Sequence, residues 1–339
     1  MTILPTRTFN DDFLNPFRQR GDSAADAVIE SVAKSQGHEG LGKLMQYLGD
    51  MDNLDYTQQP IEIQEFLKKN QDLPTFADVA KMKQAVIFFK KYEQLIPLIL
   101  ACYSLPYCYA AADGAQVLWL SQRIKNDTLK RLEETGQFVF EIMQERDWNN
   151  GRNAIKILKI RLMHAAVRYF TQQYPQWNRA WGLPINQEDM AGTNLAFSYI
   201  VIKGLRKLGT VAHASDEEAF LHFWNVVGFL LGVEEALLPQ NLREAFHIDQ
   251  RIAQRQFKTS EAGRGLTQAL IHVFRQQWKE DSILQNLIIA QMRLFLSHPV
   301  ADLLAIPKPS LEQEVVKWGN KTSIFKLFFL TLSRRLSAY

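Results

Sequence analysis

The sequence predicts an all-α fold, and three observations support this prediction. Only 12 prolines and 17 glycines are spread over 339 residues, which leaves long stretches without a helix breaker. From residue 76 onward, apolar residues recur at three- and four-residue steps, the spacing of one helix face. Hydrophobic residues make up 47% and charged residues 22% of the chain, at a mean hydropathy of -0.19. These values exclude a disordered chain and an integral membrane protein, and the few breakers disfavour a sandwich of short strands.

The chain divides into an N-terminal segment, residues 1–75, and a body, residues 76–339. The first segment is polar and is interrupted by Pro16, Pro60 and Pro74, so we expect short peripheral helices there. In the body we predict helices over residues 76–103, 118–144, 154–173, 187–208, 215–238, 242–257, 265–278, 283–296 and 311–318. The stretch SLPYCYAAADGA, residues 104–115, is predicted to be a loop.

Local signals support several of these boundaries. Asn186 is a predicted N-cap, and Gly209 is predicted to end the helix that begins there. Ser215 and Glu218 have the spacing of a capping box, in which each side chain satisfies an amide at the helix start. Within 154–173, one face is apolar or aromatic: Ile155, Leu158, Leu162, Ala165 and Tyr169.

Charge, cysteine content and missing motifs exclude several function classes. The 39 basic and 36 acidic residues are interleaved and give a net charge of +3, so nucleic acid is not an expected partner. Cys102 and Cys108 lie in an apolar stretch and are expected to be buried thiols, not a disulfide scaffold. Phosphate-binding glycine loops, H-E-x-x-H and C-x-x-C-H are absent. A di-iron bundle needs two Glu-x-x-His pairs, and only Glu244 and His247 have that spacing.

The two ends of the chain bear on its location. The N-terminal MTILPTRTFNDDFLNPFRQR lacks the order of a secretory signal, so a cytoplasmic protein is expected. No window reaches the roughly 20 apolar residues of a spanning helix. The C-terminal KTSIFKLFFLTLSRRLSAY mixes Phe and Leu with basic residues. It can pack as a terminal helix, which we favour, or make peripheral contact with a membrane.

Arg161, His164 and Arg168 stand at relative positions -3, 0 and +4, which places them on one helix face. Burying two guanidinium groups and an imidazole together is costly unless anions are supplied. A haem meets this requirement, because His164 can ligate the iron and the arginines can bind the two propionates. The alternative is that Asp or Glu side chains of neighbouring helices neutralise the arginines and that His164 is a core residue. The spacing leaves both interpretations open.

An ordered series of motifs resembles the catalytic domain of the rubber oxygenases. That family comprises latex clearing proteins and the fungal ER-bound oxygenase of mycophenolic acid synthesis. The resemblance covers about residues 73–239. It is carried by Leu105-Pro106, Arg131-Leu-Glu-Glu-Thr135, Arg161-x-x-His164-x-x-x-Arg168, Asn186-Gln-Glu-Asp-Met-Ala-Gly-Thr193, Gly204-Leu-Arg-Lys-Leu-Gly209, His222-Phe-Trp224, Gly228-Phe-Leu-Leu-Gly232-Val and Leu237-Leu-Pro239.

The resemblance implies an all-helical, globin-like core with peripheral N-terminal and C-terminal helices, which binds one b-type haem. It implies His164 as proximal iron ligand with Arg161 and Arg168 beside it. Arg131 and Thr135 would shape the opposite side of the pocket. Latex clearing proteins have a lysine immediately before the matching threonine, whereas this chain has Glu134. Glu134 is therefore a candidate proton acceptor on the distal side, with Glu133 as the fallback.

These inferences predict a haem-dependent oxygenase. Its expected partners are dioxygen and a small apolar, unsaturated substrate, which it oxygenates or cleaves at a carbon–carbon double bond. Secreted family members carry export signals that this N-terminus lacks, so polyisoprene is not the expected substrate. Two alternatives are a haem or gas sensor or carrier without turnover, and a haem-free helical interaction protein.

Overall fold

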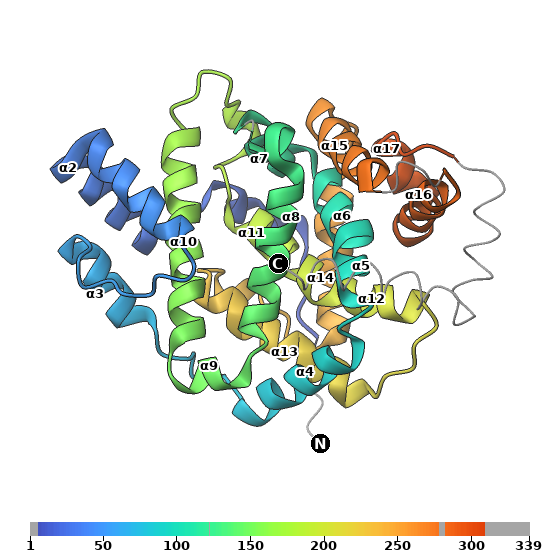
Figure 1. The fold of residues 1–339 in the computed structure, drawn as a ribbon, viewed down its shortest axis with the longest axis horizontal. Coiled ribbons are helices and arrows are strands. Elements are labelled where there is room, and N and C mark those ends of the chain that lie inside the picture. The colour runs from blue at the N-terminus through green and yellow to red at the C-terminus, as the bar shows by residue number, and fades with distance from the viewer. Residues whose placement is uncertain (1–5, 122, 278–281, 309–339) are drawn as a thin grey trace.

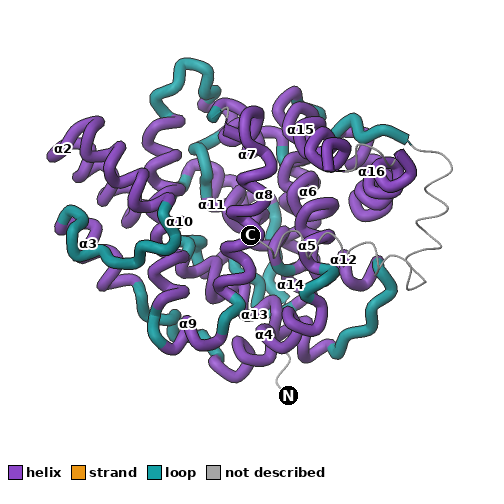
Figure 2. The backbone as a smooth tube through the Cα atoms, in the orientation of Figure 1, coloured by secondary structure: helices purple, strands orange, loops and turns teal. Residues whose placement is uncertain are grey.

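The computed structural model describes residues 6–121, 123–277 and 282–308 (Figure 1). Helices joined by loops make up this part of the chain (Figure 2), and the described residues form no strand beyond one isolated bridge between Ala111 and Phe257. The predicted all-α class is confirmed. None of the helices in these ranges is long and apolar enough to cross a bilayer.

The helices follow one another along the whole described chain. The α-helices are α1 (Asp11–Leu14), α2 (Ser23–Gly49), α3 (Ile61–Asn70), α4 (Val79–Tyr92), α5 (Ile96–Ile99), α6 (Leu105–Ala110), α7 (Ala112–Leu120), α8 (Arg123–Ile142), α9 (Glu145–Asn149), α10 (Arg152–Thr171), α11 (Gln187–Phe197), α12 (Tyr199–Lys207), α13 (Ala214–Leu230), α14 (Leu242–Gln256), α15 (Glu261–Gln277), α16 (Ser282–Leu296) and α17 (His298–Leu303). Short elements are the 3₁₀ helices η1 (Asn15–Gln19), η3 (Arg179–Trp181) and η4 (Glu235–Leu237), and the π-helix η2 (Leu100–Ser104).

Two apolar clusters hold these helices together, and α10 contributes to both. The larger cluster fills the centre and includes Phe223 and Trp224 of α13. The smaller one lies where α10 packs against α2 and α3, at one side of the molecule (Figure 1). Leu158 and Leu162 of α10 are fully buried there. On the other side of the molecule, α8 packs on α7 and α15, and α13 packs on α4.

The predicted loop over residues 104–115 is wrong, because α5, η2, α6 and α7 are almost continuous through this region. Pro106 lies inside the stretch predicted to be a loop, and Pro97 lies inside the helix predicted over 76–103. Both lie in the first turn of a helix, at N1 or N2. Proline is tolerated there because the amides of the first turn have no acceptor within the helix. The helix predicted over 76–103 is interrupted instead after Tyr92, where α4 ends.

The helix predicted over 187–208 is two helices, α11 and α12, separated at Ser198. The backbone of Ser198 has φ -109° and ψ -81°, outside the helical range, and its hydroxyl donates to the Asn194 carbonyl at 2.9 Å. Such a bond to the carbonyl four residues earlier bends helices. Two predicted boundaries are confirmed: the Asn186 side chain accepts from the Asp189 amide, and Gly209 has a left-handed φ of 74°.

The predicted capping box at Ser215 does not form. Helix α13 begins at Ala214 without a side-chain cap. The Glu218 carboxylate instead accepts from the Leu242 amide at 3.0 and 3.2 Å, and so serves the N-terminus of α14. Helix α13 also ends at Leu230, earlier than predicted. The helix predicted over 311–318 lies outside the described residues.

Candidate functional site

The three polar residues predicted to share a face all lie on α10, and the two arginines meet the N-terminus of α2. Arg161 donates from Nε and Nη2 to the two carboxylate oxygens of Asp22, at 2.5 and 2.9 Å. The exposed fractions of these two side chains are 13% and 5%. The Arg161 guanidinium also lies 5.3 Å from the centre of the Phe66 ring, on α3. Arg161 therefore ties α10 to α2 and α3 of the N-terminal segment.

Arg168 makes the second connection, two helical turns further along α10. Its Nε donates to Asp26 of α2 at 2.8 Å, and its Nη1 donates to the Ile185 carbonyl at 2.7 Å. The side chain is 1% exposed, and its Nη2 is buried without a hydrogen-bond partner. Burial raises the pKa of Asp26, and the Arg168 charge opposes this shift. The anions opposite both arginines are therefore carboxylates of the N-terminal segment, and Arg168 keeps one unused donor.

A glycine lies against each of these ion pairs. A Cβ at Gly232 would lie 2.3 Å from Oδ2 of Asp22 and 2.7 Å from Nε of Arg161. Gly232 also has a left-handed φ of 89°, which residues with a Cβ rarely adopt. A Cβ at Gly21 would lie 2.7 Å from Oδ2 of Asp26. Gly228, four residues before Gly232, packs against the Asn194 side chain of α11, whereas Gly232 lies beyond the end of α13.

His164 lies between the two arginines and makes no hydrogen bond to any described residue. Its Nδ1 is fully buried without a partner, while the side chain as a whole keeps partial exposure, so Nε2 is the more accessible nitrogen. Burial, followed by the charges of Arg168 and Arg131, lowers the pKa of His164 to about 4, and Asp22 opposes this shift. The imidazole is therefore neutral near pH 7, the form that ligates metals.

The residues predicted to form the opposite side of the pocket lie on α8, and they divide between two faces. Arg131 and Thr135 are partly buried, and the Arg131 charge acts on both His164 and Tyr109. The Thr135 hydroxyl donates to the Arg131 carbonyl at 2.8 Å. Glu134 is exposed, together with Leu129, Lys130 and Gln137. Arg131 and Thr135 thus face inward, and Glu134 lies on the solvent side.

A b-type haem fits the residues on this side of α10. The neutral His164 has a nitrogen free to ligate iron, and the buried Nη2 of Arg168 is an unused donor for an anion. Among the described residues, Arg131 has no carboxylate partner, so it is a second cation available to a propionate. Within the same ranges, no group of three or more His, Cys, Asp and Glu side chains forms an alternative metal site.

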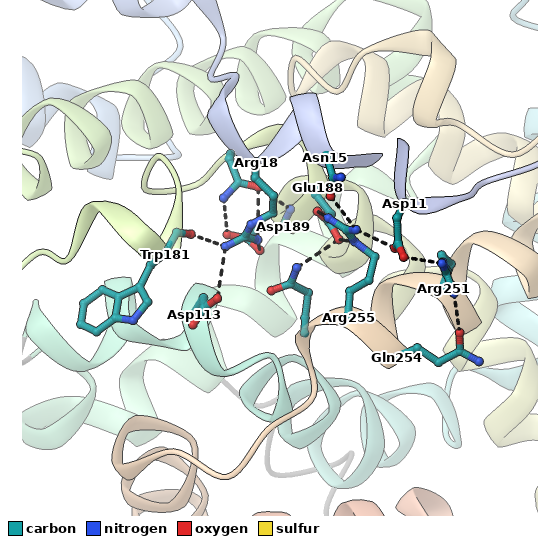
Figure 3. Close-up of polar contacts among 12 residues, drawn as sticks. Asp11, Asn15, Arg18, Asp113, Trp181, Glu188, Asp189, Arg251, Gln254 and Arg255 are labelled. Atoms are coloured by element: carbon teal, nitrogen blue, oxygen red, sulfur yellow. Dashed lines mark hydrogen bonds and ion pairs between the residues drawn. The ribbon is translucent and has the colours of Figure 1, made fainter. Parts of the chain in front are cut away.

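A separate set of polar contacts joins the N-terminal segment to α11 and α14 (Figure 3). Arg18 binds Asp189 and lies 3.9 Å from Asp113. Arg255 donates to both oxygens of Glu188, at 2.9 and 3.2 Å. Burial raises the pKa of Asp189 to about 6, and Arg18 opposes this shift. Two acidic residues of the 186–193 motif, Glu188 and Asp189, therefore bind the arginines near the C-terminal ends of α14 and η1.

Gln187 of the same motif connects this set of contacts to the site on α10. Its Nε2 donates to the carbonyls of Gly21 and Gly232, at 2.9 and 2.8 Å, and its Oε1 accepts from the Glu234 amide at 2.8 Å. These are the two glycines that lie against the arginine–aspartate pairs. Gln187 thus holds both loops in place. Gln187 lies within the 186–193 motif, but its spacing from Gly21 and Gly232 gives no local signal of this role.

Comparison with known proteins assigns the family. Residues 96–331 match the model of the ER-bound oxygenase mpaB/B'/Rubber oxygenase catalytic domain. This chain belongs to that family. A rubber oxygenase of Streptomyces sp. (strain K30) is 23% identical over 297 residues, which cover 86% of this chain and 72% of the relative. The predicted resemblance to the rubber oxygenases is therefore confirmed.

A solved structure supports the same assignment at the level of the fold. The structure titled latex clearing protein LCP in the closed state superposes with a TM-score of 0.74 at 21% sequence identity. The match covers 93% of this chain and 84% of the other. The fold of this chain is therefore similar to that of the latex clearing protein over most of its length.

Proposed function

We propose that this protein is a b-type haem-dependent oxygenase of an apolar, unsaturated organic substrate. One observation carries the proposal: His164 is a neutral imidazole with an accessible nitrogen, placed among cations on a helix of an oxygenase family. When bound, haem would supply the redox chemistry that activates dioxygen, which no side chain can supply.

The residues around His164 would have separate roles. His164 would ligate the iron through Nε2. Arg168, through its unused Nη2, and Arg131 would neutralise the propionates. Arg161, together with Asp22, would hold α10 against α2 and so fix the position of His164. Arg161 was predicted to bind a haem propionate. We propose a positioning role for it instead, because its guanidinium already binds both carboxylate oxygens of Asp22.

The α8 residues would form the side where substrate and dioxygen enter. Arg131 and Thr135 face inward and would line this side. The predicted role of Glu134 as proton acceptor stays a prediction, since its side chain is on the solvent face of α8. The rubber oxygenase named above indicates unsaturated hydrocarbon chemistry in the family. For this chain we propose a smaller unsaturated lipid or terpenoid.

The decisive test combines haem content with oxygen consumption. Purified protein should give a pyridine haemochrome spectrum, and His164→Ala should be folded but haem-poor. His247→Ala is the matched control, because His247 is an exposed histidine on α14. The His164 assignment is wrong if His164→Ala keeps full haem content and an unchanged absorption spectrum.

Turnover separates the oxygenase from the sensor or carrier. Oxygen uptake would be followed with squalene, and with saturated squalane as its matched control. The proposal expects uptake with squalene alone, together with oxygenated or cleaved products. A haem-loaded protein that binds dioxygen or carbon monoxide but consumes no oxygen with unsaturated substrates favours the non-catalytic alternative.

A further inference from the structure

The outward face of α4 has an unusual composition. Residues 79–92 include four lysines and no acidic residue. At 100° per residue, the exposed positions of α4 fall on one arc of the helix, apart from Lys81 in the first turn, which lies among the buried positions. This arc contains Val79, Lys83, Ile87, Lys90 and Lys91, all of which are exposed. The opposite arc is buried in the main core. The outward face of α4 is therefore both basic and apolar, and it meets α9 through the ion pair between Lys83 and Glu145.

The apolar side chains on this face are unusually exposed. Val79 is 51% exposed and Ile87 is 68% exposed. They are eight residues apart, which corresponds to about 12 Å along the helix. Leu73 lies near the N-terminal end of α4 and is 37% exposed. At the other end is Val211, 89% exposed, whose carbonyl accepts from the Tyr92 hydroxyl at 3.3 Å.

These four residues are half of the eight large hydrophobic side chains exposed in the described part of the chain. Val79 and Ile87 lie on α4, Leu73 precedes it in the chain, and Val211 contacts its last residue, Tyr92. Helix α4 lies at the same edge of the molecule as α9 (Figure 1). A shallow groove adjoins this face and is lined mainly by Leu73, Val79, Met82, Val86 and Trp148. Aligned exposed hydrophobic side chains of this kind mark an interaction surface.

We infer that this face of α4, with Leu73 and Val211 at its two ends, docks on an anionic lipid surface. Charge complementarity favours lipid as the occupant. Lys90 and Lys91 make no ion pair with any described residue, and only Lys83 is partly offset, by Glu145 at 3.2 Å. Basic side chains around aliphatic ones match the headgroup and acyl layers of an anionic membrane.

The chemistry of the proposed substrate agrees with docking on a lipid surface, although the docking inference does not depend on that substrate. An apolar substrate dissolves in a bilayer, so docking would bring the protein to its substrate. No residue of the α4 face is among those assigned to the haem or to the α8 side of the pocket. Vesicle binding can therefore be measured without any assumption about haem or turnover, and failure of either proposal would leave the other standing.

The test is co-sedimentation of the full-length protein, as purified, with vesicles. Phosphatidylcholine vesicles would be compared with vesicles that also contain phosphatidylserine, at low and high salt. We expect binding to the anionic vesicles only, weakened by salt. Lys90→Gln combined with Lys91→Gln should lower the affinity by about 30-fold. Ile87→Ser should lower it by about tenfold at both salt concentrations, because it removes buried apolar area.

Matched variants on the N-terminal segment control for charge and hydrophobicity. Lys34→Gln combined with Lys43→Gln makes the same change in net charge on α2, and Ile61→Ser removes an isoleucine that is 60% exposed on α3. Both controls should bind like wild type. The inference is overturned if wild type shows no preference for anionic vesicles, or if the controls lose as much affinity as the α4 variants.

A second copy of the chain is the competing occupant. Light scattering in the absence of lipid would detect it. A wild-type dimer that Ile87→Ser converts to a monomer would assign the α4 face to self-association and overturn the lipid proposal.

Discussion

Arg161 and Asp22 form a two-point ion pair that joins the helix of His164 to the first turn of α2. Both contacts are within hydrogen-bond distance, at 2.5 and 2.9 Å, and both side chains are largely buried. A guanidinium matches a carboxylate in this bidentate geometry, which fixes orientation as well as charge. The N-terminal segment, predicted to be peripheral, therefore supplies the anions that pair with Arg161 and Arg168 of α10.

Asp22→Asn should destabilise the fold, because it leaves the largely buried Arg161 without its anion. Asparagine keeps the shape of the side chain and the N-cap function of position 22, so the variant isolates the charge. We expect a loss of about 3 kcal/mol in the free energy of unfolding. Denaturant unfolding monitored by circular dichroism would measure it.

The control is Glu30→Gln, which breaks an ion pair with Lys34 on the same helix. That pair is exposed, with an N–O distance of 3.8 Å, and should contribute below about 0.5 kcal/mol. Equal losses in the two variants would show that the Arg161–Asp22 pair is no more important than a surface pair.

Gly232→Ala should also destabilise the protein, by about 3 kcal/mol from the left-handed backbone and the clash with Asp22 together. The added Cβ would lie 2.3 Å from Oδ2 of Asp22, and the carboxylate cannot move without losing Arg161. Gly42→Ala is the control, since nothing lies within 4 Å of its Cβ position on α2. Alanine there should be neutral or stabilising by up to about 1 kcal/mol. Thermal unfolding of both variants decides, and an unchanged midpoint in Gly232→Ala would contradict the prediction.

The helix of His164 was predictable, because its signals are local. The periodic apolar face over residues 154–173 predicted a helix that the structure places at Arg152–Thr171. The partners of its arginines were not predictable from spacing. Asp22 precedes Arg161 by 139 residues, and no local pattern connects the two. The motif series indicated which residues matter, but only packing shows that α2 supplies their anions.

The errors in the predicted fold have the same origin. Pro106 was interpreted as a loop signal, yet the chain uses it in the first turn of α6. Ser215 and Glu218 have the spacing of a capping box, but the Glu218 carboxylate finds the α14 amide instead. Ser198 breaks a helix without any glycine or proline at that position. In each case the residue type is compatible with two local structures, and the surrounding fold shows which of them forms.

The protein should become less stable as the pH is lowered, because of a contact between His222 of α13 and the N-cap of α4. The His222 Nε2 accepts a hydrogen bond from the Asp78 amide at 2.9 Å, which only an unprotonated nitrogen can do. Burial, followed by the Lys81 charge, lowers the pKa of His222 below 6.5. Because the folded state resists protonation, the contribution is complete above pH 6.5 and is lost as the pH falls through the folded pKa.

His222→Gln tests this linkage, because a glutamine oxygen accepts the same bond without titrating. Melting temperatures would be measured between neutral and mildly acidic pH. The wild-type protein should lose more stability on acidification than His222→Gln does. Since His164 is present in both proteins, its own titration cancels in the comparison. Parallel pH profiles would mean that His222 makes no contribution.

The last prediction concerns which α8 residues act on the reaction. Adjacent helix residues point about 100° apart, and the structure places Arg131 and Thr135 inward and Glu134 on the solvent face. The Arg131 charge acts on His164, so it is close enough to influence an anion bound between α8 and α10. We therefore expect Arg131→Gln to lower both haem content and oxygen uptake. Thr135→Val should lower neither strongly, because its hydroxyl is already bonded to the Arg131 carbonyl.

Glu134→Gln and Glu133→Gln, made separately, then decide the question of the proton acceptor. A general base contributes about 100-fold or more to turnover. A loss of that size in Glu134→Gln alone, with haem content intact, would establish that this carboxylate reaches the substrate despite its exposure. Turnover close to wild type in both variants would remove the glutamates from the mechanism. Arg131 would then be the charged residue of α8 that acts on the pocket, since its charge acts on His164, the proposed iron ligand.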